Sequence, residues 1–232
     1  MIAGHFATAL VAKRAAPQGH LAFYLVVCQM QDLLWHSLHF AGVEPTLPTH
    51  PMLASLSSMH AEMTYSHDLL PLPLWVLLAL LAGRALFGEW RTGWVAGALV
   101  AVHALCDALS GYPHHLFGPD SAEVGLGLYV SAPYLAIFVE ALFTAAVIAW
   151  VLRRDAKAGV RHSRTTLLVW ALVFGGGILS LLPTAELSVV ELTGLPAYEG
   201  LGGTLVPALI LTYAIMFAAL VWADARAAPA RA

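Results

Sequence analysis

Six long apolar stretches restrict the fold of this chain more than any other feature. They cover residues 20–43, 69–89, 92–112, 127–152, 164–184 and 203–224. A helix needs about 20 mainly apolar residues to cross the hydrocarbon core of a bilayer. Hydrophobic residues make up 59% of the chain and charged residues 11%, so little polar surface remains to coat a soluble domain. We therefore expect an all-α integral membrane protein of about six transmembrane helices.

The basic residues test this topology independently, because Lys and Arg bias the loops that carry them toward the cytoplasm. If six spans alternate in direction, all 11 Lys and Arg residues fall on one side. The opposite loops carry Asp and Glu but no Lys or Arg. Both termini are therefore predicted to be cytoplasmic. The basic residues are Lys13, Arg14, Arg84, Arg91, Arg153, Arg154, Lys157, Arg161, Arg164, Arg226 and Arg231.

A shorter apolar segment, residues 2–12, precedes the first span. At about 1.5 Å per residue, a helix of this length cannot cross a core that is about 30 Å thick. We expect a re-entrant or interfacial helix. The apolar run comes before Lys13 and Arg14, which reverses the order of a cleavable signal peptide, so we expect the segment to be retained.

Charge and cysteine content exclude two classes of function. The net charge is −3, and the topology accounts for the basic residues, so nucleic acid is not an expected partner. Cys28 and Cys106 fall inside spans, which indicates packing residues rather than a disulfide framework or a cysteine-rich zinc motif.

Ionisable residues at membrane depth are the candidates for chemistry, because each costs at least about 2.5 kcal/mol to insert. Asp32 precedes His36 by four residues, and His103 precedes Asp107 by four. This spacing places an imidazole and a carboxylate on one helix face. Glu140 lies in the middle of the fourth span. Mixed imidazole and carboxylate ligands suit zinc or another divalent first-row metal.

Two further histidines are expected to reach the same depth. His67 lies at the outer mouth of the second span, and His5 lies about 12 Å of helix above Lys13. Four separate segments can therefore bring five groups together, as an enclosed metal site requires. The site is expected to open toward the non-cytoplasmic half of the membrane.

Several short motifs follow one another in the order found in a known family. They are Gly4-His5 with Lys13-Arg14, Gln31-Asp32-Leu33-Leu34-Trp35, Tyr65-Ser66-His67-Asp68-Leu69-Leu70, His103-Ala104-Leu105-Cys106-Asp107 and Val124-Gly125-Leu126-Gly127-Leu128-Tyr129. In these motifs residues 1–154 resemble the bacterial membrane-bound metal-dependent hydrolases of the YdjM type. Residues 155–232, which we expect to form two additional transmembrane helices of the same bundle and a cytoplasmic tail, lie outside the resemblance.

The resemblance implies a hydrolase of the bacterial inner membrane with one set of metal ligands. Zinc is the expected metal, with manganese or iron as alternatives. Asp68 departs from the family, which usually has Ser at this position, and the segment that follows the last aspartate of the set also differs. The implied ligands are His5, Asp32, His67, His103 and Asp107.

The other polar residues have competing interpretations. For His20, His36 and His39 a packing role is favoured over metal binding. For His60, His114 and His115, in the outer loops, an ordinary exposed role is favoured over contact with substrate or with a second metal. Glu140 is equally compatible with holding a ligand imidazole and with a hydrogen bond between helices.

Two main functions remain open. The first is hydrolysis of an ester or phosphoester, on a lipid or lipid-linked substrate drawn from the surrounding membrane lipids, by a metal-activated water. Asp68, Asp107 and Glu140 are the candidate bases. The second is a proton or metal-ion carrier that uses the same His and Asp residues. Haem binding by His36 and His103 is a third interpretation, and the neighbouring aspartates favour a harder metal.

Overall fold

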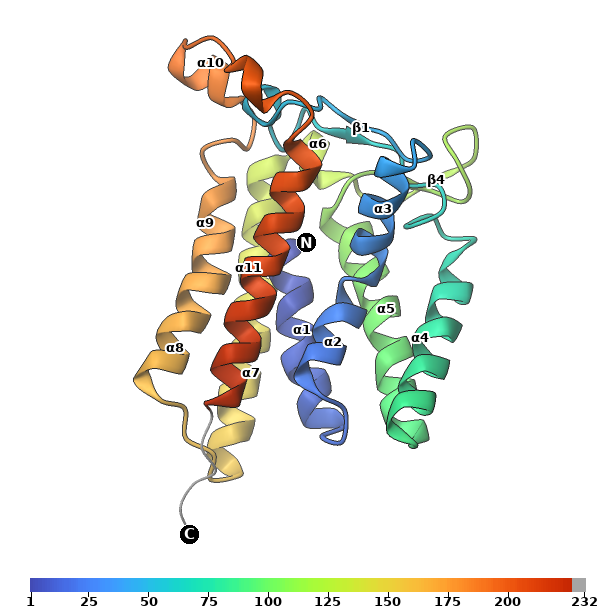
Figure 1. The fold of residues 1–232 in the computed structure, drawn as a ribbon, viewed down its shortest axis with the longest axis vertical. Helices are drawn as coiled ribbons and strands as arrows, with labels where there is room; N and C mark the ends of the chain where they lie inside the picture. The colour runs from blue at the N-terminus through green and yellow to red at the C-terminus, as the bar shows by residue number, and fades with distance from the viewer. Residues whose placement is uncertain (227–232) are drawn as a thin grey trace.

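The computed structural model describes residues 1–226 and confirms an all-α fold (Figure 1). Four of its helices are long and apolar enough to cross a membrane, which is the mark of an integral membrane protein. The third of them contains a π-helical stretch, η2 (Ala171–Gly176), between α8 (Arg164–Trp170) and α9 (Gly177–Leu181). The four are α5 (Trp90–Ser110), α7 (Pro133–Lys157), α8 to α9 (Arg164–Leu181) and α11 (Leu205–Ala225).

The other two expected spans are shorter or interrupted, so the count of six is not established. α4 (Leu72–Phe87) is apolar but has 16 residues. The stretch 20–43 forms two helices, α2 (Leu21–Cys28) and α3 (Met30–Phe40). They meet at Gln29, whose backbone (φ −113°, ψ 13°) leaves the helical region. The sequence has no Pro or Gly near Gln29, so it contains no local signal for this break in the helix.

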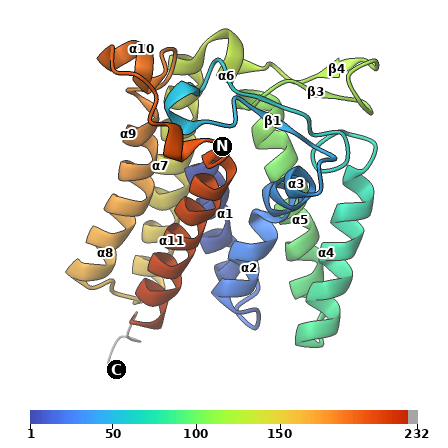
Figure 2. The same cartoon turned by 45° about the horizontal axis from the view of Figure 1, so that its top comes forward.

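The N-terminal helix α1 (Ile2–Ala15) lies inside the bundle rather than on its surface (Figures 1 and 2). It contacts α2, α5, α7 and η2, and most of its residues are buried. It begins part-way along the long axis and runs toward the end of the bundle where α4 and α5 meet. This placement fits a re-entrant helix, and it brings the first turn of α1 to the middle of the bundle.

Close backbone contact joins α4 and α5. A Cβ atom added at Gly93 would lie 2.6 Å from the Leu80 carbonyl oxygen, and one added at Gly83 would lie 2.9 Å from the Gly93 Cα. Only glycine fits at these two positions. Small residues of this kind let helices approach within a bilayer, where packing rather than water exclusion drives association.

The basic residues lie at the ends of α1, α7 and α11, at the start of α8 and at the turn between α4 and α5. Figure 1 shows all of these helix ends at one end of the bundle, which we call the basic end. Arginines there lie over tryptophan rings, for example Arg226 over Trp222 at 4.0 Å and Arg154 over Trp150 at 5.2 Å. Such pairs are typical of a membrane interface. Arg231 and the rest of the expected tail beyond residue 226 lie outside the described residues.

Loops and short elements cover the opposite end, which we call the loop end (Figure 2). Two antiparallel hairpins, β1 with β2 and β3 with β4, are the only strands among the described residues. The short elements at this end are β1 (Thr46–Leu47), η1 (Pro51–Leu53), β2 (His60–Ala61), β3 (His114–His115), β4 (Glu123–Val124), α6 (Leu128–Ser131), α10 (Val189–Thr193) and η3 (Glu199–Leu201).

Leucine and phenylalanine side chains remain exposed along the helices between the two ends, which is what a lipid-facing surface requires. Leu142 and Phe138 of α7, Leu172 of η2 and Leu211 of α11 are each more than 60% exposed. The buried core lies instead around α1, with residues of α2, α5, η2 and α11 packed against it.

Candidate metal centre

The structure brings together all five residues that the sequence singled out as metal ligands. His5 comes from α1, Asp32 from α3, His67 from the loop before α4, and His103 and Asp107 from adjacent turns of α5. Each is at most 7% exposed. Two overlapping groups of three, His5 with His103 and Asp107, and Asp32 with His67 and His103, could hold a metal ion.

Four ligand atoms form the most regular part of this cluster. His67 Nε2 lies 3.2 Å from Asp32 Oδ1 and 3.4 Å from His103 Nε2. His103 Nε2 lies 3.0 Å from Asp107 Oδ2 and 3.9 Å from Asp32 Oδ1, and His67 Nε2 lies 3.9 Å from Asp107 Oδ2. Ligand atoms of a tetrahedral zinc site with bonds of about 2.0 to 2.1 Å lie about 3.3 Å apart. These five separations, from 3.0 to 3.9 Å, lie near that value, so the spacing is compatible with a bound metal ion.

His5 belongs to the other side of the cluster. Its Nε2 lies 3.0 Å from Asp107 Oδ1, the oxygen that points away from His103, and its ring stacks on His103 with centroids 3.7 Å apart. The Met1 amino nitrogen lies 2.6 Å from the same oxygen and 3.1 Å from His5 Nε2. Asp107 thus connects two groups of nitrogen atoms through its two oxygens.

Outer hydrogen bonds orient three of the ligands. The carbonyl of Cys28, at the break between α2 and α3, accepts a hydrogen bond of 2.7 Å from His103 Nδ1. This bond requires a proton on Nδ1 and leaves Nε2 free to bind the cluster. Ser66 Oγ lies 2.8 Å from His67 Nδ1, and Tyr213 of α11 donates to Asp32 Oδ2 at 3.0 Å. Metal-binding residues are commonly held by such partners.

The charge of the cluster favours a cation. No Lys or Arg in the described part of the chain pairs with Asp32 or Asp107; their partners are imidazoles, Tyr213 and the Met1 amine. Two imidazolium ions with nitrogens 3.4 Å apart would repel each other by about 4 kcal/mol or more at an effective dielectric constant of 20. A metal ion bound by neutral imidazoles and the two carboxylates removes this conflict, and the nitrogen and oxygen donors suit a divalent first-row metal.

Asp68, one of the three candidate bases, faces backbone donors. Its Oδ1 accepts from the His115 amide at 2.9 Å and its Oδ2 accepts from the Gly118 amide at 2.6 Å. These bonds favour a structural role in the loop that contains β3 and β4. Its role as a base stays a prediction.

Glu140, another of the three candidate bases, joins two helices. Its Oε1 accepts from the Ala3 amide at 2.7 Å and the Gly4 amide at 3.3 Å, and its Oε2 accepts from the Tyr129 hydroxyl at 2.9 Å. A carboxylate at the first turn of α1 satisfies amide donors that lack helical partners and stabilises the helix dipole. Of the two roles that the sequence left open, these contacts support the bond between helices, which fixes the turn that carries His5.

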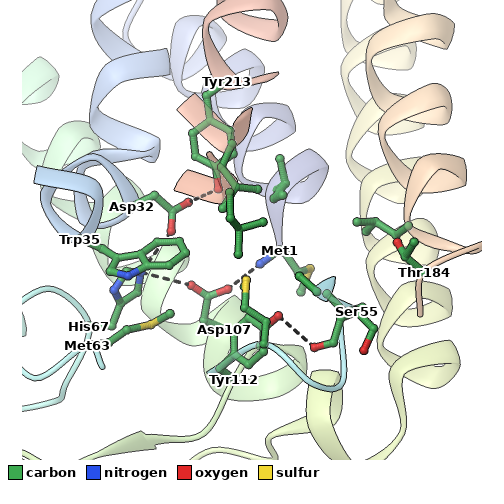
Figure 3. A pocket seen from close by; sticks show the side chains of 18 of the residues that line it. Met1, Asp32, Trp35, Ser55, Met63, His67, Asp107, Tyr112, Thr184 and Tyr213 are labelled. Atoms are coloured by element: carbon green, nitrogen blue, oxygen red, sulfur yellow. Dashed lines mark hydrogen bonds and ion pairs between the residues drawn. The ribbon is translucent and has the colours of Figure 1, made fainter. Parts of the chain in front are cut away.

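A pocket of about 210 Å³ adjoins the cluster, shown in Figure 3. Asp32, His67 and Asp107 line it, whereas His5 and His103 lie behind them. Residues of the loop 51–63, of α9 and of α11 form much of the remaining wall. The cluster therefore borders this pocket through Asp32, His67 and Asp107.

The remaining histidines differ in environment. His60 is exposed and His115 is partly buried, whereas His114 is 6% exposed, against the expectation for an outer loop. His114 is buried because the β3–β4 hairpin folds over the cluster and stacks its ring on His67, with centroids 5.4 Å apart. His36 is buried between Trp35 and Tyr213 without a hydrogen-bond partner on either ring nitrogen.

Sequence reasoning missed Tyr213, because the helix that carries it lies outside the region of family resemblance. A tyrosine in the middle of an apolar span is a usable signal, since a buried hydroxyl usually finds a hydrogen-bond partner. That signal predicts a polar group nearby but does not identify Asp32.

No protein-family model, curated protein or solved structure matches the chain. The resemblance to the YdjM-type hydrolases therefore stays a prediction from the motifs.

Proposed function

We propose that this protein is a membrane-embedded metal-dependent hydrolase that cleaves an ester or phosphoester. The observation that carries the proposal is the buried set of ligand atoms from Asp32, His67, His103 and Asp107, with neighbouring atoms 3.0 to 3.9 Å apart. Zinc fits this donor set best, with manganese or iron as alternatives. His5, paired with the second Asp107 oxygen, completes the group of five.

A divalent metal held by these residues would supply Lewis-acid chemistry, which activates a bound water. The chain's own residues provide access, orientation and a proton acceptor. Three of the four ligands line the pocket, so a substrate can approach the cluster from that side. Tyr213 orients Asp32, and the Cys28 carbonyl orients His103. Asp107, which lines the pocket, is the candidate proton acceptor, and His5 Nε2 lies 3.0 Å from its Oδ1.

The proposed setting is the bacterial inner membrane, crossed six times, with both termini on the cytoplasmic side. The clustering of basic residues at one end of the bundle supports this orientation. For six crossings, α4 and the pair α2 and α3 must each count as a span. The pocket then faces the non-cytoplasmic half of the bilayer, because the loops at the loop end form part of its wall.

Metal analysis of the purified protein tests the proposal. We expect stoichiometric zinc, manganese or iron in the wild type and its loss in His103→Ala and Asp107→Ala. His36→Ala is the matched control, because His36 is equally buried but has no hydrogen-bond partner on either ring nitrogen. This control should keep its metal. A folded wild type that stays metal-free after chelation and resupply of metals would contradict the proposal.

Turnover is the second readout. Protein loaded with metal should hydrolyse lipid esters or phosphoesters in detergent micelles, and the two metal-site variants should not. Retained metal without turnover on any of these substrates would instead favour the carrier function, which uses the same residues.

A further inference from the structure

The pocket beside the cluster has two chemically different sides. One side consists of Asp32, His67 and Asp107, and the other includes Leu181 of α9 together with Leu205 and Leu209 of α11. Helices α9 and α11 both expose leucines along their outer surfaces, where the bilayer surrounds them. The lining of the pocket therefore combines the charged cluster with apolar side chains of two membrane helices.

The arrangement of α11 places this apolar side toward the loop end. α11 packs against α8, and in Figure 1 α9 ends and α11 begins toward the loop end. Leu181 is the last residue of α9, and Leu205 is the first residue of α11. The wall between them is thus built from the two helix ends that lie farthest from the basic end.

His114 supplies a polar group that the protein itself does not use. It lines the pocket and is 6% exposed, yet neither of its ring nitrogens has a hydrogen-bond partner in the described chain. Its ring lies parallel to that of His67, at an interplanar angle of 3°. Buried polar side chains are normally hydrogen-bonded, so an imidazole without a partner in a pocket indicates a bound molecule with polar atoms.

The size of the pocket restricts what can fill it. Sites that enclose a whole drug-sized ligand measure roughly 300 to 1,000 Å³. At about 210 Å³, this pocket accepts a small polar group and the first carbons attached to it. A longer hydrocarbon chain has to continue outside the pocket, and the wall formed by Leu181, Leu205 and Leu209 is the apolar part of the lining that such a chain would follow.

We propose that the pocket binds the head of a lipid phosphoester, with the acyl chain leaving between α9 and α11 and with His114 hydrogen-bonded to the head. This inference rests on the proposed function, whose substrate class it narrows. A phosphate oxygen can meet the cluster on one side and the imidazole of His114 on the other. Lateral entry from the bilayer follows, because the loop end is covered by the hairpins and by the loop 51–63.

Photo-crosslinking tests the route of the chain. The probe is a phosphatidic acid with a diazirine near the glycerol end of one acyl chain, mixed into phosphatidylcholine vesicles that contain the full-length protein. We expect label to concentrate on Leu181, Leu205 and Leu209. Leu172 and Leu211, on the lipid-facing surface of the same two membrane segments, should receive far less. Label spread evenly over all five leucines would overturn the proposal.

Blocking variants separate entry from general lipid contact. Leu209→Trp places a larger side chain in the apolar part of the pocket. The photo-crosslinked label on Leu181 and Leu205 should then fall by about tenfold or more. Leu211→Trp, two residues along on the exposed surface of the same helix, should leave the labelling unchanged. Metal content serves as the check that both variants keep the cluster.

A substitution at His114 tests the head contact. In a competition experiment, unlabelled phosphatidic acid displaces the probe, and the concentration that halves the labelling measures affinity. This concentration should be about tenfold higher for His114→Ala than for the wild type, which is the cost of one lost hydrogen bond to a charged group. His114→Gln, which keeps a donor and an acceptor, should recover most of this loss, and His115→Ala should have no effect. Equal affinity in the wild type and in His114→Ala would remove His114 from the site.

These experiments can fail separately from the proposed function. Pocket labelling without turnover would support the lipid site and contradict the hydrolase. Metal-dependent hydrolysis with label spread evenly over the surface would support the hydrolase and contradict this route of substrate entry.

Discussion

Two buried groups of charges lie in this bundle, one at the basic end and one at the centre. At the basic end, Asp155 of α7 is 5% exposed and pairs with the Arg14 guanidinium, whose Nε lies 3.0 and 3.1 Å from its two oxygens. His162 Nε2 adds a contact of 2.7 Å. This carboxylate has a permanent cation of its own.

The central cluster contains two carboxylates and no guanidinium or lysine ammonium. Its nitrogens come from His5, His67 and His103, with the Met1 amine beside one oxygen of Asp107. Imidazoles change charge readily and bind metals through a neutral nitrogen, whereas a guanidinium does neither. The comparison indicates that a buried acid with its own arginine has a structural role, and that acids surrounded by imidazoles leave a place for an exchangeable cation.

The largest expected effect comes from giving the central cluster a lysine ammonium, a side-chain cation that it lacks. His67→Lys places an ammonium next to Asp32 and removes a ligand nitrogen. A positive charge at this position repels a divalent ion by several kcal/mol, so metal affinity should fall by about a hundredfold or more. Metal affinity is measured by titrating metal into the chelated protein. The thermal midpoint of unfolding is then measured with and without chelator.

The thermal midpoint makes this test specific to charge. A bound metal stabilises the folded wild type by mass action, so chelation should lower its midpoint. His67→Lys should have a midpoint that does not depend on chelator, because the ammonium now balances the carboxylates. His67→Gln, which removes the ligand without adding charge, should be the least stable of the three. Stoichiometric metal in His67→Lys would show that metal binding does not depend on the absence of a Lys or Arg side chain from the cluster.

A smaller effect on metal affinity is expected when the hydrogen bond from Tyr213 to Asp32 is removed. Tyr213→Phe removes the hydroxyl that donates to Oδ2 at 3.0 Å but keeps the ring in place. Loss of such an outer partner typically weakens metal binding by about 10 to 100-fold. Metal titration measures the shift, and Tyr24→Phe, whose hydroxyl donates to the Ala16 carbonyl, is the control. Unchanged affinity in Tyr213→Phe would exclude α11 from the metal site.

Most of the bundle could be predicted from the sequence, because span length and basic-residue placement are strong physical constraints. The residues expected at 92–112 and 203–224 form α5 and α11 within two residues at either end. The break at Gln29 could not be predicted, since it depends on tertiary contacts around a polar residue with no local helix-breaking signal. For α1 the length of the segment excluded a full crossing and left a re-entrant and an interfacial placement open, and its position inside the bundle depends on tertiary contacts.

The candidate site could be predicted in composition but not in detail. Spacing by four residues put His103 and Asp107 on one face of a helix, and they do share the cluster. The same spacing paired Asp32 with His36, yet His36 Nδ1 and Nε2 have no partner. The difference lies in which neighbouring helix each face meets, and one sequence does not contain that information. The contact from Tyr213, 181 residues away from Asp32, is inaccessible for the same reason.

The smallest effect on metal binding is expected at the basic end, and it completes the comparison. Arg14→Gln leaves Asp155 with His162 as its only charged partner among the described residues. Loss of one member of a partly buried pair should lower the free energy of unfolding by about 1 to 3 kcal/mol. The thermal midpoint should then fall by about 2 to 10 °C. Adding Asp155→Asn should restore much of this loss, because no uncompensated charge then remains. Neither variant should change metal affinity, since neither residue is part of the central cluster. A loss of metal in the double variant that is as large as in His67→Lys would mean that the two groups of charges are coupled through α1, which carries both Arg14 and His5.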